Sequence, residues 1–360
     1  MTDLLSSYRG KRVLVTGHTG FKGSWLAHWL TLLGAEVTGF ALPPEDPEAH
    51  FTALGLAGRI AHVEGDIRDA EAVRAVFARA RPEAVFHLAA QAIVRRSYQA
   101  PKETFDTNAG GAVNLLEAAR GAPGLRALVF ITSDKCYRNK EWVWGYRETD
   151  ELGGEDPYSA SKAAAEMIFH AYAASFLDAR ADLGAATVRA GNVIGGGDWA
   201  KDRIVPDCIR ALRAGRPIVL RNPEATRPWQ HVLDPLRGYL TLGARLLADP
   251  ARYRGSWNFG PEIGGLFRVR DIADLAVEVW GGNASVRIEG DPDAPMEHRL
   301  LQLAIDKAKL DLGWFPAWGT ARAVRETVAW YRAAADGADV AETTTGQIAR
   351  HMRDVEARPR

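Results

Sequence analysis

A glycine-rich turn lies between an apolar strand and an apolar helix near the start of the chain. The run Lys11–Thr16 predicts a buried strand, and apolar side chains from Trp25 to Leu33 recur with the spacing of one helix face. Glycine permits positive φ in such a turn, and its backbone amides then approach a phosphate whose charge the helix N-terminus favours. The same glycines would also suit an ordinary turn against a closely packed helix. We expect a dinucleotide-binding turn made of Gly17, His18, Thr19, Gly20, Phe21, Lys22 and Gly23.

Strand-like and helix-like segments alternate along the first half of the chain. The alternation predicts an α/β fold, a Rossmann-type doubly wound parallel sheet of six or seven strands with helices on both faces. Beyond residue 190 the spacing becomes irregular, which predicts a smaller C-terminal α/β domain. The expected domains are residues 1–190 for the dinucleotide and 191–340 for the substrate, with interleaving allowed, followed by a weakly ordered tail at 341–360.

The expected elements can be read from the apolar pattern. The expected strands are Lys11–Thr16, Glu36–Leu42, Ile60–Val63, Ala84–Ala89, Ala127–Thr132 and Ala185–Arg189. The expected helices are Asp69–Arg79, Pro101–Arg120, a helix that follows Tyr158, and Arg203–Ala214, Asp234–Leu247, Val269–Trp280 and Thr320–Ala335.

The charges of the 360 residues balance. Lys plus Arg and Asp plus Glu number 45 each, which argues against a nucleic-acid or membrane-surface protein held by bulk electrostatics. An anionic ligand therefore has to be bound by local groups. Cys136 and Cys208 cannot form a disulfide framework, no apolar run is long enough to span a membrane, and the histidines and cysteines lack metal-ligand spacing. We expect a cytoplasmic protein without a metal site.

Two further strand ends carry residue types suited to a cofactor. Asp66 follows the third strand, where its carboxylate can accept from an adenine amino group or, almost equally well, cap the next helix. Ile67 stands beside it. Small residues end the fourth strand, as needed where the backbone lies close to a cofactor. The candidates there are Leu88, Ala89, Ala90 and Gln91.

A tyrosine and a lysine four residues apart predict the chemical centre. Positions i and i+4 share one helix face, so the Lys162 ammonium is expected to lower the pKa of the Tyr158 phenol. A phenolate formed in this way is a base. Ser133 adds a hydroxyl at the end of the strand that would abut this helix. The pair alone is a weak signal, and its combination with the glycine turn and Ser133 makes it specific.

Together these motifs resemble the extended short-chain dehydrogenase/reductase family over nearly the whole chain. Within that family, the sequence resembles the CDP-glucose 4,6-dehydratases. The dTDP-glucose dehydratases carry threonine, aspartate and glutamate at the strand end where this sequence has Ser133, Asp134 and Lys135. The segments that carry the resemblance are Gly17–Gly23, Thr132–Tyr137, Arg189–Trp199, Arg227–Asp234 and Lys307–Trp314.

The resemblance implies a lyase that releases water from CDP-D-glucose, in deoxysugar and cell-surface polysaccharide biosynthesis. Bound NAD would carry a hydride from C4 to C6 of the sugar within one turnover. Tyr158, helped by Lys162 and Ser133, would take the proton of the 4-hydroxyl, and protonated Asp134 would give a proton to the departing 6-hydroxyl. Lys135 would remove the C5 proton, or would act as a cation that stabilises the enolate or helps to hold the cofactor. The product would be CDP-4-dehydro-6-deoxy-D-glucose.

The resemblance also implies binding residues and an assembly. Asn108 and Thr132 join the cofactor set, and helices near Pro101–Arg120 and Tyr158–Phe176 would pair in a homodimer or homotetramer. The second strand ends without an acidic residue for the adenosine ribose, so the preference for NAD rests on the resemblance. His18 would contact the cofactor or stay a surface turn residue. The expected substrate residues are Gln91, Ser133, Asn192, Trp199, Arg203, Arg227 and Glu297, with a solvated helix start as the alternative for Arg203 and core packing as that for Trp199.

Other functions remain compatible with the same motifs. A nucleotide-sugar 4-epimerase needs the Tyr158 base but no acid for a leaving hydroxyl, so Asp134 favours dehydration. A 4,6-dehydratase for another nucleotide would use the same catalytic groups. A noncatalytic dinucleotide-sensing protein belongs to a different class, because a fold does not fix a function. Such a protein has no need of Tyr158 and Lys162 together.

Overall fold

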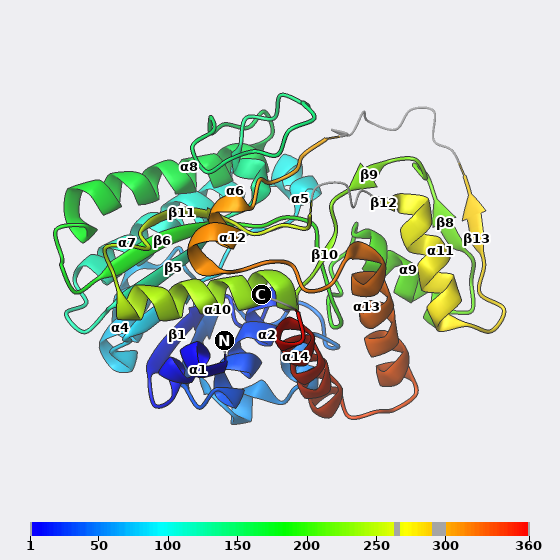
Figure 1. The fold of residues 1–360 in the computed structure, drawn as a ribbon, viewed down its shortest axis with the longest axis horizontal. Helices are drawn as coiled ribbons and strands as arrows, with labels where there is room; N and C mark the ends of the chain where they lie inside the picture. Colours follow the sequence, from blue (N-terminus) through cyan, green and yellow to red (C-terminus); the bar gives the residue numbers. More distant parts are fainter. Residues whose placement is uncertain (1, 263–266, 290–299, 359–360) are drawn as a thin grey trace.

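Seven parallel strands form one sheet in the computed structural model, which describes residues 2–262, 267–289 and 300–358. The strand order is β11-β6-β5-β4-β1-β2-β3 (Figure 1), and each neighbouring pair is parallel. The predicted Rossmann-type doubly wound sheet is confirmed. The strands are β1 (Arg12–Thr16), β2 (Glu36–Ala41), β3 (Ala61–Glu64), β4 (Ala84–His87), β5 (Ala127–Ile131), β6 (Gly184–Arg189) and β11 (Gly255–Asn258).

Helices cover both faces of the sheet. One face carries α2 (Phe21–Leu32) and α10 (Leu233–Ala248), and the other carries α4 (Ala70–Ala80), α7 (Gly111–Arg120) and α8 (Pro157–Tyr172). The remaining helices around the sheet are α1 (Thr2–Leu5), α3 (His50–Ala53), α5 (Val94–Gln99), α6 (Pro101–Phe105), α12 (Asp306–Leu312) and α14 (Val340–Glu356).

Side chains along the strands alternate between two hydrophobic cores. In β1, Val13 and Val15 pack into the core on the α2 and α10 side, whereas Leu14 packs into the core formed with α4, α7 and α8. In β5, Val129 and Phe130 are divided in the same way. A strand buried on both faces is a continuous apolar run, which explains why the sequence predicted the central strands closely.

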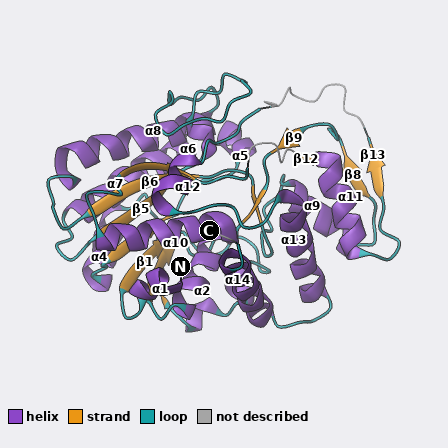
Figure 2. Ribbon diagram, in the orientation of Figure 1, coloured by secondary structure: helices purple, strands orange, loops and turns teal. Residues whose placement is uncertain are grey.

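A smaller region lies at one end of the sheet (Figure 2). Its described residues form three helices and three pairs of short strands, and the helices match the predicted positions closely. The helices are α9 (Ile204–Arg213), α11 (Val269–Trp280) and α13 (Thr320–Ala335). The strand pairs are β7 (Val193–Ile194) with β10 (Gln230–His231), β8 (Ile218–Leu220) with β13 (Val286–Ile288), and β9 (Thr226–Arg227) with β12 (Phe267–Arg268).

Residues beyond 190 also return to the sheet. The strand β11 pairs with the edge of β6, and α10 packs on the face that α2 covers. The sequence did not predict β11, which supplies the seventh strand. The chain beyond residue 190 thus contributes both to the sheet layer and to the smaller region.

Two helical segments differ from expectation. The segment predicted as one helix over Pro101–Arg120 consists of α6, the wider turn η3 (Asp106–Gly110) and α7. The expected weakly ordered tail is wrong for most of its length, because α14 buries Ile348 and Val355. Its polar residue His351 is fully buried and bonds Asp234 of α10 at 2.9 Å. Polar contacts thus hold a helix that the apolar pattern did not reveal.

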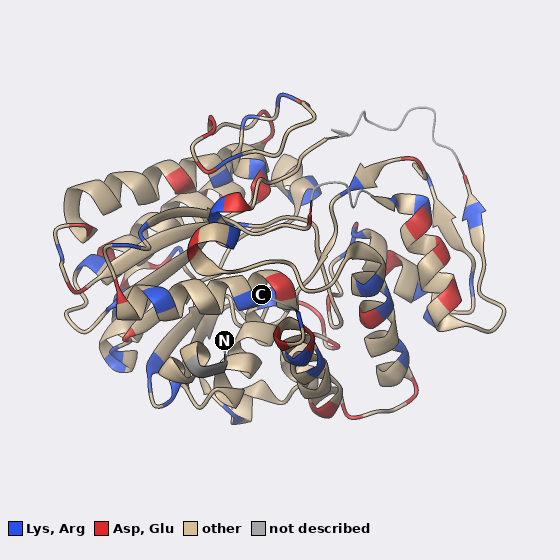
Figure 3. Cartoon of the chain, viewed as in Figure 1, with Lys and Arg blue, Asp and Glu red and all other residues tan. Residues whose placement is uncertain are grey.

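Charged side chains of both signs are interspersed over the chain (Figure 3), and the two signs are equal in number. No helix in the described part of the chain has the length and apolar character that crossing a bilayer requires. Cys136 and Cys208 are buried free thiols.

Candidate active site

The glycine turn after β1 packs tightly against the end of β4. Gly17 has a φ of +75°, and a Cβ atom there would lie 2.7 Å from the backbone nitrogen of Ala89. A Cβ atom at Gly23 would lie 2.1 Å from the carbonyl oxygen of Gly17. Gly20 precedes α2 without a side-chain cap, so the first amides of the helix are left for an anion. A dinucleotide pyrophosphate fits this cradle.

His18 turns inward from the glycine turn. Its ring is fully buried over Gly39 of β2, and its Nε2 lies 2.7 Å from Nδ1 of His62. Burial, followed by the charge of His62, lowers the pKa of His18 to about 4. The alternative of a surface turn residue is therefore wrong. Thr19 donates to the carbonyl oxygen of Leu42 at 2.8 Å and so ties the turn to the end of β2.

Asp66 lies at the end of β3, as predicted, but it does not cap the next helix. Its carboxylate accepts from Nε of Arg68 at 2.8 Å. Asp69 caps α4 instead, since its Oδ1 accepts from the backbone nitrogen of Glu71 at 2.9 Å. Ile67 is buried under Gly111 of α7. The role of Asp66 and Ile67 toward adenine stays a prediction.

Gln91 and Asn108 join the end of β4 to α8. The backbone nitrogen of Gln91 donates to Oδ1 of Asn108 at 2.9 Å, and Nδ2 of Asn108 donates to Oγ of Ser161 at 2.9 Å. The amide of Gln91 donates to Oγ1 of Thr104 at 2.9 Å and accepts from the backbone nitrogen of Ile93 at 2.5 Å. Gln91 is thus engaged inside the protein, and its predicted contacts with cofactor and substrate stay predictions.

The predicted catalytic residues come from two neighbouring elements. Tyr158 and Lys162 lie one turn apart on α8, and they are 7% and 5% exposed. Ser133 and Asp134 follow β5, at the start of the short helix η4 (Asp134–Cys136), and both are buried. The hydroxyl of Ser133 donates to Oδ1 of Asp134 at 2.9 Å and accepts from the backbone nitrogen of Lys135 at 3.2 Å.

Burial dominates the acidity of Tyr158. It raises the pKa of the phenol to about 12, although the hydrogen bond with Ser133 and the charge of Arg203 lower it. The pKa is thus raised and not lowered as expected, and the groups that oppose the rise are Ser133 and Arg203 rather than Lys162. Desolvation penalises the phenolate more than the surrounding groups stabilise it.

Three cations interact with one another near the catalytic residues: Lys162 with Lys22, and Lys22 with Arg203, which also acts on Tyr158. Burial, followed by the charge of Lys22, lowers the pKa of Lys162 to about 7. Burial, followed by the charge of Arg203, lowers the pKa of Lys22 to about 8, while Asp134 opposes the change. Arg203 is half-buried at the start of α9, with Nη1 2.8 Å from Oδ2 of Asp198, so it is not simply solvated. Such a cluster suits an anionic ligand or a negative charge that develops during a reaction.

Asp134 occupies a space that exists because residue 191 is glycine. A Cβ atom at Gly191 would lie 1.8 Å from Oδ2 of Asp134 and 2.1 Å from its Cγ. Asn192 follows with a φ of +52°, and its Nδ2 donates to Oδ2 of Asp134 at 3.3 Å. The loop after β6 therefore fits around the carboxyl group that follows β5.

A pocket opens beside these groups. Its lining includes Asp134, Lys135 and Ser159, together with the predicted substrate residues Asn192 and Arg227. The pocket is thus lined by the Ser159 hydroxyl near the start of α8, by the Asp134 carboxyl group and by the cations Lys135 and Arg227. Trp199 packs against Tyr331 at 5.0 Å between ring centroids and against Arg213, as its core-packing alternative predicted. Glu297 lies outside the described residues.

Residues 13–253 match the model of the NAD dependent epimerase/dehydratase family. The chain belongs to this family. The CDP-glucose 4,6-dehydratase of Salmonella typhimurium (strain LT2) is 46% identical over 349 residues, 96% of this chain and 97% of that protein. The UDP-glucose 4-epimerase of Thermotoga maritima, solved with UDP-glucose, is 25% identical with a TM-score of 0.76 and covers 89% of this chain and 99% of its own. The UDP-glucose 4-epimerase of Thermus thermophilus, solved with NAD, is 27% identical with a TM-score of 0.73. The match covers 89% of this chain and 99% of that one.

NAD is the cofactor of the epimerase/dehydratase family, as the sequence predicted. The residues present here fit it, since the turn after β1 offers an amide cradle and includes Lys22, whose charge interacts with those of Lys162 and Arg203. Nucleotide sugars are the substrates expected of this family. Within the described ranges, no three His, Cys, Asp or Glu side chains gather as metal ligands would.

Sequence reasoning missed some members of the site. Gly191 lies inside a quoted motif, but no role was given to it, because only the fold shows that its missing Cβ makes room for Asp134. Tyr137, Asp156 and Ser159 also line the pocket. Asp156 had a local signal, since an aspartate before Pro157 is a helix cap, and its Oδ1 accepts from the backbone nitrogen of Ser159 at 2.9 Å.

Proposed function

We propose that the protein converts CDP-D-glucose to CDP-4-dehydro-6-deoxy-D-glucose and water. One observation carries the proposal beyond the family: a buried carboxyl group, Asp134, lines the pocket and accepts a hydrogen bond from Ser133, whose hydroxyl is also hydrogen-bonded to Tyr158. An epimerase needs no acid for a leaving hydroxyl, whereas a dehydratase does. The 46% identity to a CDP-glucose 4,6-dehydratase supports the cytidine nucleotide.

Tyr158 and Ser133 bind the sugar 4-hydroxyl, and Tyr158 takes its proton. The glycine turn after β1 would hold NAD, which would supply the hydride-carrying chemistry between C4 and C6. The phenol needs help in losing its own proton, because burial raises its pKa to about 12. Arg203 supplies positive charge near it, and Lys162, one helical turn away with a pKa of about 7, exchanges protons readily near neutral pH.

Dehydration requires an acid and a base on the pocket side of the sugar. Asp134 gives its proton to the 6-hydroxyl, which leaves as water, and Lys135 accepts the C5 proton that the 4-ketone has made acidic. Both residues line the pocket. The C5 proton is returned when the hydride reaches C6, so the product has gained a 6-methyl group and lost one water.

The decisive experiment offers the purified protein CDP-, dTDP-, UDP- and GDP-glucose, each with deuterium at C4. We expect a 4-keto-6-deoxy sugar from CDP-glucose, with the deuterium in the new methyl group. A C4 epimer as the sole product would identify an epimerase instead. Loss of the label to water, or no turnover with any of the four, would contradict the proposal.

We also propose that the protein is a cytoplasmic homodimer, or a tetramer built from such dimers. The apolar side chains of Phe105, Met167 and Phe176 are exposed on α6, α8 and the turn after α8, with Met167 64% exposed. Pairing of these helices would remove that surface from water. Light scattering of the wild type and of Met167→Lys tests the assembly, and a monomeric wild type would refute it.

A further inference from the structure

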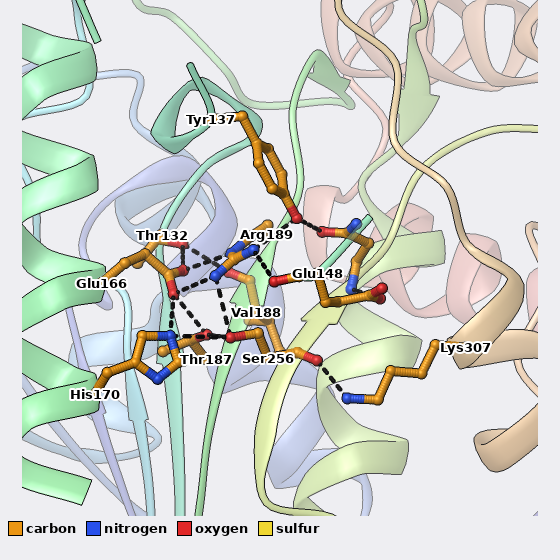
Figure 4. Close-up of polar contacts among 11 residues, drawn as sticks. Thr132, Tyr137, Glu148, Glu166, His170, Thr187, Val188, Arg189, Ser256 and Lys307 are labelled. Atoms are coloured by element: carbon orange, nitrogen blue, oxygen red, sulfur yellow. Dashed lines mark hydrogen bonds and ion pairs between the residues drawn. The ribbon is translucent and has the colours of Figure 1, made fainter. Parts of the chain in front are cut away.

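Behind the catalytic residues lies a buried ion pair between Glu166 of α8 and Arg189 at the end of β6. The two side chains are 0% and 1% exposed. Figure 4 shows the guanidinium of Arg189 surrounded by acceptors. Each of its five N–H groups has one: Glu166 Oε1 at 3.0 Å, Glu166 Oε2 at 2.8 Å, Tyr137 OH at 2.6 Å, the Glu148 carbonyl at 3.1 Å and Ser256 Oγ at 3.1 Å.

The pair holds the catalytic turn from both of its ends. Thr132, which precedes Ser133, donates its hydroxyl to Oε1 of Glu166 at 2.5 Å. Tyr137, which follows Cys136, accepts from Nη1 of Arg189 at 2.6 Å. The turn that carries Ser133, Asp134 and Lys135 is therefore attached at residue 132 to one charge and at residue 137 to the other.

The same pair fixes the turn relative to α8. Glu166 lies one helical turn after Lys162 and two turns after Tyr158. A shift of α8 along β5 would break the hydrogen bond from Thr132 and the two bonds from Arg189 together. The distance between the phenol and the acid is thus controlled by groups that do not line the pocket.

Glu166 is ionised at neutral pH. Burial alone would raise the pKa of Glu166, but His170, Arg189 and Thr132 hold it at about 2. Two desolvated charges contribute little net stability compared with apolar residues of the same volume, even when they are well paired. The directional hydrogen bonds of the pair do specify one arrangement of the side chains around it, and this arrangement includes Thr132 and Tyr137 on either side of the catalytic turn.

We propose that Glu166 and Arg189 are positioning residues, which set the distance between Tyr158 and the Ser133–Asp134–Lys135 turn in the proposed dehydration. The expected effect on catalysis rests on the proposed function, whereas the expected effect on the position of the turn does not. Neither residue touches the substrate. Their loss would misplace the acid relative to the sugar without removing a binding contact.

The chain offers a matched pair of substitutions as a test. Thr132 and Thr187 both donate a hydroxyl to Glu166, at 2.5 and 2.9 Å, and both are buried. Only Thr132 adjoins the catalytic turn, whereas Thr187 lies inside β6. Replacing either threonine by valine leaves both charges of the pair in place, so we expect the variants to fold. Glu166→Ala or Arg189→Ala would instead leave one buried charge without its partner, which is strongly destabilising.

The buried Thr132 hydroxyl is bonded to Glu166, so its predicted place in the cofactor set does not require it to contact NAD. For Thr132→Val we therefore expect kcat to fall about tenfold, with KM for the nucleotide sugar and the affinity for NAD within about twofold of the wild type. Thr187→Val should lose similar thermal stability but keep its kcat per folded site. Tyr137→Phe removes the contact with Arg189 at the other end of the turn but keeps the ring that lines the pocket, so kcat should fall as in Thr132→Val. Equal kcat in both threonine variants, or a loss explained by weaker NAD binding, would overturn the proposal.

A second measurement does not depend on turnover. Hydrogen exchange in the cofactor-free protein should become faster across residues 133–137 in Thr132→Val and Tyr137→Phe, and should stay unchanged there in Thr187→Val. This result would support the positioning role even if the wild type dehydrated no nucleotide sugar, in which case the proposed function alone would fail. Unchanged exchange at residues 133–137 in Thr132→Val would overturn the positioning role even in an active dehydratase.

Discussion

Replacing Gly191 by alanine tests whether the chemistry depends on the place of the Asp134 carboxyl group. The added Cβ would lie 1.8 Å from Oδ2, 2.1 Å from Cγ and 2.4 Å from Oδ1 of Asp134, where ordinary contacts begin near 3.4 Å. Gly191 does not have a positive φ, so alanine causes no backbone strain there. The carboxyl group has to move by roughly 1–2 Å, and a displacement of about 1 Å at a reacting group costs about a hundredfold in rate.

A hundredfold loss in kcat corresponds to about 2.7 kcal/mol of transition-state free energy. The first step, oxidation at C4, uses Tyr158 and not Asp134, so it should survive. We therefore expect Gly191→Ala to accumulate reduced nicotinamide after CDP-glucose is added, while release of the 4-keto-6-deoxy product slows about a hundredfold. Rapid-mixing absorbance of the nicotinamide and product analysis separate the two steps.

Two control variants separate the displacement of Asp134 from a general effect of adding a methyl group. A Cβ atom at Gly124 would meet nothing within 4 Å, so Gly124→Ala should behave as the wild type. In an Asp134→Ala background the crowding is gone, and Gly191→Ala should then cost no further thermal stability. Product formation by Gly191→Ala within threefold of the wild-type rate would refute the placement of Asp134 as the acid.

Four further outcomes are expected. Tyr158→Phe should lose about a thousandfold in kcat while NAD binding, followed by fluorescence titration, is retained; normal turnover would exclude the phenol as base. Lys135→Ala should abolish incorporation of solvent deuterium at C5, and unchanged incorporation would leave Lys135 only the role of a cation. Lys22→Met removes a charge that lowers the pKa of Lys162, so the high-pH limb of kcat/KM should move upward from about 7, and an unmoved limb would contradict the coupling. Acidification should unfold the protein, because burial lowers the pKa of His18 to about 4 and that of His231 to about 3. Their contribution to stability is present above pH 6.5 and is lost as pH falls toward 4, by about 2 kcal/mol for each at pH 5, which urea unfolding at pH 7 and pH 5 measures.

The strands of the sheet could be predicted because they are buried on both faces and therefore are apolar throughout. β11 could not, since Gly255–Asn258 offers only Trp257 as an apolar side chain, and its pairing with β6 joins residues about 70 positions apart. The helix α14 was missed for a related reason. It buries Thr344 and His351, which hydrogen-bond to His50 and Asp234, and apolar periodicity does not detect a polar face of this kind.

The site shows the same division. Tyr158 and Lys162 could be predicted from their spacing, because a helix places positions i and i+4 on one face. The acidity of Tyr158 could not, since it depends on how deeply tertiary packing buries the phenol. The inward turn of His18 likewise depends on Gly39 of the neighbouring strand, which leaves space for the ring.

The topology explains why separate motifs meet in one pocket. β5 and β6 are parallel neighbours, and α8 is the crossover that joins them, so their carboxyl ends and the N-terminus of α8 lie at the same edge of the sheet. Asp134 follows β5, Gly191 and Asn192 follow β6, and Tyr158 lies in the first turn of α8. A crossover alone places these groups within several ångströms, which is too loose for proton transfer. The buried pair of Glu166 and Arg189 ties α8, β6 and the turn after β5 to one another, and so supplies the accuracy that the topology lacks.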